Sequence, residues 1–144
     1  MATSGLSRYG GWGLALLRVV VGGVFMMHGQ QKLFEFGFDG VAENFSRMGI
    51  PLAEVAAVFI TLLEFGGGIA LILGLFTRPI ALLLACDMLV AMLLVHLKNG
   101  FFNPGGVEFT LTLFAASIAL VLNGPGEGAL DQLIGKKRPG SGSS

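Results

Sequence analysis

The sequence has little charge and almost no cysteine. Only 12% of the 144 residues are Asp, Glu, Lys or Arg, about half the share found in a soluble globular domain. Nine acidic residues balance nine basic ones, so no basic field is present that could hold nucleic acid. The single cysteine, Cys86, lies in an apolar run. It excludes a disulfide framework, a paired-thiol redox centre and a cysteine-based metal site, and no metal is expected.

Apolar residues are abundant instead: 53% of the chain is hydrophobic, and the mean hydropathy is +0.78. A helix needs roughly 20 apolar residues to cross a bilayer, because its backbone polar groups must be satisfied within the segment. Four stretches qualify as spans, and they are residues 12–33, 52–75, 79–97 and 107–122. The sequence therefore predicts an all-α integral membrane protein, a four-helix up-down bundle with the lipid bilayer as its first partner.

The segment 34–51, between the first two stretches, predicts a short interfacial helix. Asp39 can cap it, and Val41, Phe45 and Met48 fall on one face. Residues 1–138 then form a single domain. The last residues, 139–144, read Pro-Gly-Ser-Gly-Ser-Ser and predict a flexible tail or linker.

The basic residues near the ends of the stretches predict the orientation. An even number of spans puts both termini on one side, and cytoplasmic loops carry the excess of Lys and Arg. One side of the membrane would hold five basic residues, which are Arg8, Arg78, Lys136, Lys137 and Arg138. The other side would hold three, which are Lys32, Arg47 and Lys98. We expect both termini in the cytoplasm and the protein in the cytoplasmic (inner) membrane.

Seven ionisable residues fall inside or at the ends of the apolar stretches. They are Arg18, His28, Lys32, Glu64, Asp87, His96 and Glu108. Each needs a partner or a purpose, because a charge in hydrocarbon is costly. Counting the helical rise along each stretch groups them into two layers. Arg18, Asp87 and Glu64 make an inner layer, in which Arg18 can pair with either carboxylate.

The other four residues make an outer layer. His28 and Lys32 are four residues apart and share one helix face. With His96 and Glu108 they predict a polar pocket, and histidine is a ready proton carrier. Small residues also mark the second stretch: Gly66, Ala70 and Gly74 are spaced by four, and Gly67 and Gly68 adjoin them, which predicts a narrow face for helix contact.

A series of polar motifs resembles the DoxX family of small membrane proteins over roughly residues 14–133. The motifs are Leu-Arg18, Met-His28-Gly-Gln-Gln-Lys32-Leu-Phe, Glu64-Phe-Gly-Gly-Gly, Leu-Gly74-Leu-Phe-Thr-Arg78, Val-His96-Leu-Lys-Asn99-Gly100-Phe-Phe and Gly106-Val-Glu108-Phe. The resemblance implies a four-helix membrane protein. The positions that match the family's polar pattern are Arg18, His28, Lys32, Glu64, His96, Asn99 and Glu108. The resemblance implies redox work as well, since the family is linked to quinone-coupled oxidation and to oxidative-stress systems.

The leading hypothesis is a membrane subunit of a quinone-linked oxidoreductase or oxidative-stress system. His28, His96, Glu64 and Glu108 would be the catalytic, proton-handling residues. A quinone would contact Arg18, His28, Lys32, His96, Asn99 and Glu108. No flavin or nicotinamide motif is present, so electrons would come from a soluble redox partner. Whether the chain is itself catalytic stays open.

Two alternatives remain. The chain could be a membrane scaffold or assembly factor whose polar layers only hold its helices in register. It could also bind haem between His28 and His96, which lie at similar depth. The large lipid-facing surface leaves a homo-oligomer open.

Overall fold

Helices are the regular secondary structure over the part of the chain that the structure covers, and short loops join them. The computed structural model describes residues 3–136, so the predicted tail at 139–144 lies outside the described residues. The longer helices are α1 (Thr3–Gln30), α3 (Ala53–Leu73), α4 (Thr77–Ala91) and α5 (Glu108–Asn123). The shorter ones are η1 (Gln31–Phe36), α2 (Gly37–Arg47), η2 (Met92–His96), η3 (Leu97–Asn99) and α6 (Leu130–Lys136). No strand occurs within residues 3–136, which confirms the predicted all-α class.

Three helical stretches are long and apolar enough to cross a membrane. They are Arg8–Arg47, Ala53–Leu73 and Thr77–Asn99, with 40, 21 and 23 residues. The fourth apolar helix, α5, has 16 residues. At about 1.5 Å per residue it spans roughly 24 Å, somewhat less than a hydrocarbon core of about 30 Å.

The predicted interfacial helix is present as α2, but it does not begin as expected. Helix α1 continues through the π-helical segment η1 directly into α2, without a loop. The residue before α2 is Phe36, and no side chain caps this end. Asp39 therefore lies in the first turn of α2 rather than capping it. Val41 is buried, as the amphipathic pattern predicts.

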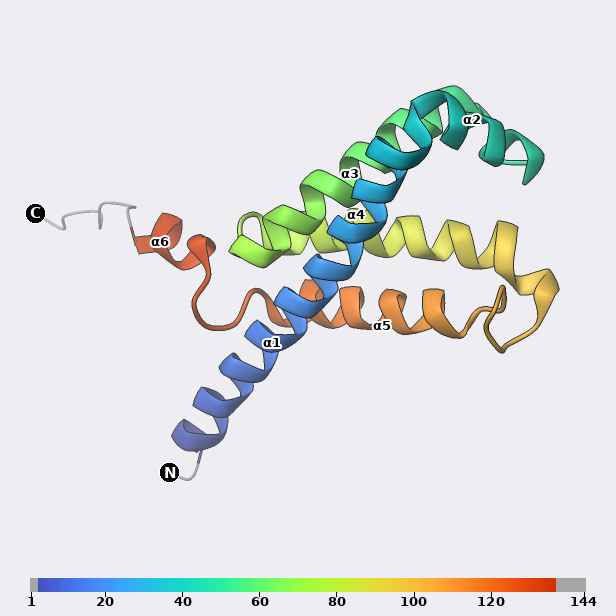
Figure 1. Cartoon of the computed structure of the whole chain (residues 1–144). Helices are drawn as coiled ribbons and strands as arrows, with labels where there is room; N and C mark the ends of the chain where they lie inside the picture. Colours follow the sequence, from blue (N-terminus) through green and yellow to red (C-terminus); the bar gives the residue numbers. More distant parts are fainter. Residues whose placement is uncertain (1–2, 137–144) are drawn as a thin grey trace, which may run out of the picture.

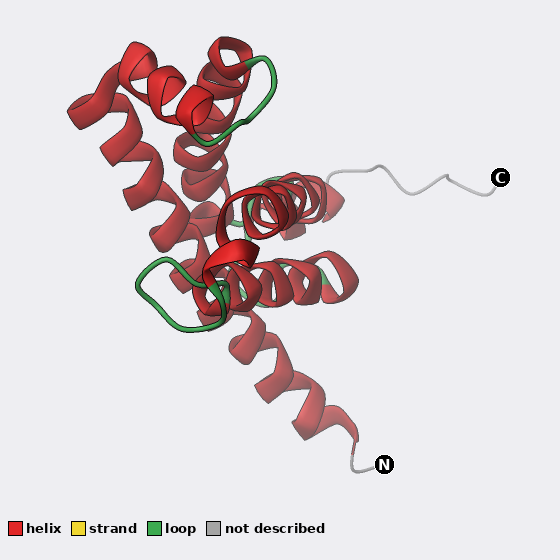
Figure 2. Cartoon of the chain, turned by 90° about the vertical axis from the view of Figure 1, so that its right-hand side faces the viewer, coloured by secondary structure: helices red, strands yellow, loops and turns green. Residues whose placement is uncertain are grey.

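The long helices form two antiparallel pairs. Helix α1 packs along α3, and α4 packs along α5. The two pairs cross steeply, so that α4 and α5 are seen nearly end-on in the view that shows the length of α1 (Figures 1 and 2). Helices α2 and α6 lie at opposite ends of the molecule (Figure 1). We call these the α2 end and the α6 end.

Glycines bring α1 and α3 into backbone contact. A Cβ atom added at Gly68 would lie 2.4 Å from the backbone nitrogen of Met26, and one added at Gly29 would lie 2.2 Å from that of Phe65. Only a hydrogen fits at these positions, so the helices approach closely. The predicted contact stripe is wrong in its first member, because a Cβ at Gly66 would meet nothing within 4 Å. Spacing alone did not show which side of α3 meets α1.

Helices α3 and α4 touch near the turn that joins them. Gly74 ends α3 with a positive φ of 70°, a conformation that glycine adopts without strain. Gly67 lies about two helical turns before Gly74. A Cβ atom added at Gly67 would lie 3.3 Å from the side chain of Ile80 and 3.7 Å from that of Leu84. From that contact toward the α2 end the two helices diverge (Figure 1). The space between them is part of the site described next.

Candidate ligand-binding site

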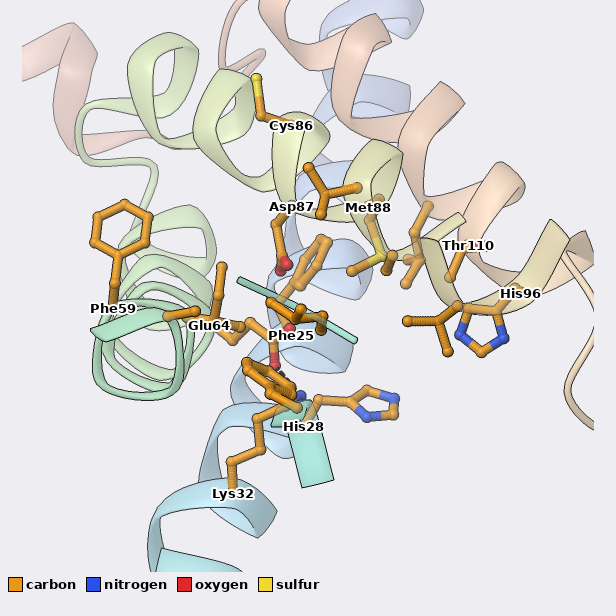
Figure 3. Close-up of a pocket in the computed structure, with 18 of the residues that line it drawn as sticks. Phe25, His28, Lys32, Phe59, Glu64, Cys86, Asp87, Met88, His96 and Thr110 are labelled. Carbon is orange, nitrogen blue, oxygen red and sulfur yellow. Dashed lines mark hydrogen bonds and ion pairs between the residues drawn. The ribbon is translucent and has the colours of Figure 1, made fainter. Parts of the chain in front are cut away.

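A cavity of about 530 Å³ lies between the two helix pairs, in the half of the molecule nearest α2. Its volume falls in the range of about 300–1,000 Å³ that is typical of small-molecule sites. Side chains from α1, η1, α2, α3, α4, η2 and α5 line it, and most are apolar. Figure 3 shows five polar groups among them, and these are His28, Lys32, Glu64, Asp87 and His96. Apolar walls with a few polar groups suit a ligand with a polar head and an apolar body.

An ion pair crosses the cavity from η1 to α3. The Nζ atom of Lys32 lies 2.5 Å from Oε2 of Glu64. The Glu64 side chain is only 4% exposed and that of Lys32 is 21% exposed. The close approach of α1 and α3 at Gly29 brings the two residues together. Because little water reaches the pair, its attraction is weakly screened.

The predicted division into two layers is wrong for this pair, since it put Glu64 in the inner layer and Lys32 in the outer one. The counting assumed that all helices run parallel to one axis. The pairs cross steeply instead (Figure 2), so distance along a helix does not measure depth in the bundle. The long lysine side chain also reaches back along its helix toward the N-terminus.

Asp87 faces this ion pair from α4. Its side chain points toward Glu64 in Figure 3, and its Oδ2 atom is buried without a hydrogen-bond partner among the described residues. A buried polar atom without a partner costs free energy unless something satisfies it. The depth counted along the helices placed Asp87 in the same predicted layer as Glu64, although Asp87 was not among the predicted site residues. Its unpaired oxygen makes it a direct candidate for ligand contact.

The two histidines line the cavity from different helices. His28 on α1 is exposed at the cavity edge, where its ring centroid lies 5.6 Å from that of Phe109 on α5. The Nδ1 atom of His96, at the end of η2, lies 2.8 Å from the carbonyl oxygen of Gly105. A carbonyl oxygen only accepts, so Nδ1 carries the hydrogen and donates it. In the neutral ring Nε2 is then left as an acceptor.

Two predicted ligand contacts, Asn99 and Glu108, do not line the cavity. The Nδ2 atom of Asn99 donates to the carbonyl oxygens of Val95 and Gly105, at 3.3 and 3.2 Å. The Oε1 atom of Glu108 accepts from the backbone nitrogen of Asn103, at 2.9 Å. Both side chains thus fix the loop that follows η3. Asn99 and His96 contact the same Gly105 carbonyl oxygen, and of the two only His96 lines the cavity.

Arg18 lies outside the cavity, and the predicted pairing with Asp87 or Glu64 is wrong. Its side chain is buried and donates to three carbonyl oxygens in the segment between α5 and α6. They belong to Pro125, Glu127 and Gly128, at 2.7, 3.3 and 3.4 Å. This returning segment packs on α1, because Gly126 comes so close to Gly11 that a Cβ would lie 2.4 Å from the Gly11 carbonyl oxygen. The predicted pairing was based on depth along the helices, and such a count does not include carbonyl groups in a segment outside the helices.

Asp131 completes this contact at the α6 end. Its two carboxylate oxygens accept from the backbone nitrogens of Phe76 and Thr77, at 2.7 and 2.9 Å. The N-terminus of α4 is therefore capped by a residue of α6. A carboxylate there also interacts favourably with the helix dipole. Arg18 and Asp131 together tie residues 125–131 to α1 and to the N-terminus of α4.

We expect Arg18→Lys to destabilise the protein by about 1–3 kcal/mol although the charge is kept. A lysine ammonium is a compact charge that lacks the planar, forked donors of the guanidinium, so it cannot reach all three carbonyl oxygens. Unfolding by a denaturing detergent in micelles measures the effect. The matched control is Arg47→Lys, since Arg47 is exposed and its ion pair is with the likewise exposed Glu43. Equal stability of the two variants would show that only the charge of Arg18 matters.

The fold and the cavity define a class: a helical membrane protein with a cluster of ionisable side chains enclosed by apolar helices. The DoxX family model matches residues 13–97, and the chain belongs to the DoxX family of membrane proteins. The predicted resemblance is thereby confirmed. No solved structure matches the chain significantly.

Related proteins cover nearly the whole chain. A protein of Haemophilus influenzae named only as uncharacterized is 37% identical over 136 residues, which is 92% of this chain and 98% of that protein. The Bacillus subtilis protein named "Putative oxidoreductase CatD" is 37% identical over 127 residues, 87% of this chain and 90% of that protein. The Escherichia coli inner membrane protein YphA is 28% identical over 125 residues, 83% and 88% of the two chains.

Proposed function

We propose that this protein is the membrane subunit of a redox system and that its cavity binds a quinone-like ligand. The observation that carries the proposal is the cluster of Lys32, Glu64 and Asp87 inside an apolar cavity. In this cluster the Oδ2 atom of Asp87 has no hydrogen-bond partner among the described residues. The relative named "Putative oxidoreductase CatD" supports the redox class. All four helices α1, α3, α4 and α5 would span the inner membrane, with both termini in the cytoplasm.

The cavity offers the contacts that a quinone head group needs. A quinone carries two carbonyl oxygens on a flat apolar ring, so it requires hydrogen-bond donors between apolar walls. The Lys32 ammonium is a donor, and Phe25 and Phe109 supply aromatic walls. The Nε2 atom of His96 is an acceptor, which suits the hydroxyl of the reduced quinol. The same cavity therefore has partners for both redox states.

The ionisable cluster can hold and exchange a proton. Two carboxyl groups face one ammonium, so the buried group is electrically neutral only when one carboxyl keeps a proton. Reduction of a quinone takes up as many protons as electrons. Asp87 and Glu64 would deliver a proton, and His28, exposed at the cavity edge, would replace it from the surface. The electrons would come from a partner protein, since the sequence carries no flavin or nicotinamide motif.

Binding of decylubiquinone to the purified protein tests the proposal. We expect His28→Ala to weaken binding by about tenfold, equivalent to about 1.4 kcal/mol. Because His28 is exposed, its replacement should leave the fold intact. The control is Gln30→Ala, which changes an exposed residue of the same helix end that does not line the cavity. Absence of binding to wild-type protein would overturn the proposal and favour the scaffold hypothesis.

A further inference from the structure

The cavity has an apolar opening between α3 and α4. Three residues at this opening line the cavity and are also exposed on the outer surface of the helices: Phe59 is 54% exposed, Leu83 is 43% exposed and Val90 is 47% exposed. A residue can do both only where the cavity reaches the surface. All three belong to helical stretches that are long and apolar enough to cross a membrane. In a bilayer that these stretches cross, this opening would face acyl chains.

The divergence of α3 and α4 produces the opening. The two helices are held together near their turn, where Gly67 meets Ile80 and Leu84. Beyond that contact they separate toward the α2 end (Figure 1). Glu64 and Asp87 are the first carboxyl groups past the contact, about one helical turn from Gly67 and Leu84. The polar cluster consequently lies at the inner end of a gap whose outer walls are apolar.

Helix α2 covers the cavity at the α2 end, and exposed His28 and Phe109 lie at another edge, between α1 and α5. Phe45, Met48 and Ile50, in and just after α2, line the cavity from that end. Helix α2 itself packs on α3. A molecule arriving from water at the α2 end would thus meet a cover of apolar side chains. A molecule dissolved in the bilayer would meet the gap between α3 and α4.

From this geometry we infer that the ligand enters from the bilayer through the gap between α3 and α4. The ligand is accordingly a lipid-dissolved amphiphile, with its polar head at Lys32, Glu64 and Asp87 and its apolar tail in the gap. The inference rests on the proposed function only for the nature of the head group. The route itself depends on the apolar gap.

The route can be tested without any quinone. The chain has one tryptophan, Trp12, so Trp12→Phe combined with Phe25→Trp places a single fluorophore in the cavity wall, where Phe25 is only 1% exposed. Lipids brominated on their acyl chains should quench it by about half or more if chains enter the gap. Quenching of this buried position should fall at least about twofold when Val90→Phe narrows the gap. Met88→Trp is a second reporter, also buried in the cavity wall.

The matched control for the narrowed gap is Leu89→Phe. Leu89 is the neighbour of Val90 on α4 and is exposed, but it does not line the cavity. It should leave quenching unchanged. Weak quenching in the open protein, or equal quenching in the Val90→Phe and Leu89→Phe proteins, would overturn the route from the bilayer.

Quinone binding gives the second measurement. Decylubiquinone should bind at least about tenfold more tightly than the same quinone without its tail, and Val90→Phe should slow its association by about tenfold while Leu89→Phe does not. Equal binding of the tailed and tailless quinones would overturn the tail position. If bromolipids quench as expected but neither quinone binds, the route stands and the proposed head group is wrong. If both quinones bind but bromolipids do not quench, the proposed function stands and the route is wrong.

Discussion

Gly68→Ala is expected to destabilise the protein by about 1–3 kcal/mol, the usual cost of overpacking a tight contact. The new methyl group would lie 2.4 Å from the Met26 nitrogen and 2.6 Å from the Gly22 carbonyl oxygen. Both atoms belong to the backbone of α1, so no side chain can rotate to make room. The helices α1 and α3 must move apart, and the contact between Lys32 and Glu64 should lengthen. We therefore also expect weaker ligand binding.

Gly66→Ala is the matched control, two residues away in the same helix. Its methyl group would meet nothing within 4 Å, and alanine favours a helix over glycine by up to about 1 kcal/mol. This variant should be as stable as wild-type protein or slightly more stable. Unfolding in mixed micelles, followed by circular dichroism, measures both. If Gly68→Ala proves as stable as Gly66→Ala, the close crossing of α1 and α3 is not a feature of the folded protein.

The second large effect concerns the buried ion pair. Lys32→Met leaves Glu64 without its cation in a site where Glu64 is 4% exposed. Removing one partner of a fully buried pair costs about 3–5 kcal/mol, and we expect the lower part of this range because Lys32 is partly exposed. Asp87 adds to the loss, since its carboxyl group faces the same site (Figure 3). The Lys32→Met variant should also bind decylubiquinone more weakly than wild-type protein.

A double-mutant cycle separates the pair from its members. Lys32→Met combined with Glu64→Gln replaces both charges, so the double variant should regain about 1–3 kcal/mol relative to Lys32→Met alone. Arg47→Met with Glu43→Gln is the reference cycle, because that pair is exposed on both sides and should show a coupling of at most about 0.5 kcal/mol. Additive effects in the Lys32 and Glu64 cycle would mean that the two side chains do not interact.

Several features of the site could be predicted from the sequence because they depend on residue type and position along a helix. His28, Lys32 and His96 were expected to line a polar pocket, and all three line one cavity, which Glu64 of the predicted inner layer also lines. An ionisable residue in an apolar stretch must turn toward other polar groups, since lipid cannot satisfy it. The redox and quinone assignments remain proposals, because they depend on what the cavity binds.

Other features could not be predicted, because they depend on how the helices are rotated and where the chain returns. Arg18 was expected to meet a carboxylate, but carbonyl oxygens after α5 lie closer to it. Asn99 and Glu108 hold a loop instead of lining the cavity. Backbone groups took the place of the carboxylate predicted for Arg18 and of the ligand predicted for Asn99 and Glu108.

The sequence by itself determined the all-helical membrane class, since the lengths and hydropathy of the apolar stretches follow from the requirement that backbone groups be satisfied within each segment. Only the tertiary structure decided the pairing of Lys32 with Glu64, the role of Arg18 and the gap between α3 and α4. The physical reason is that a helix fixes the spacing of its residues along its own axis. The angle at which it crosses its neighbours is set by close backbone contacts such as that of Gly68 with Met26.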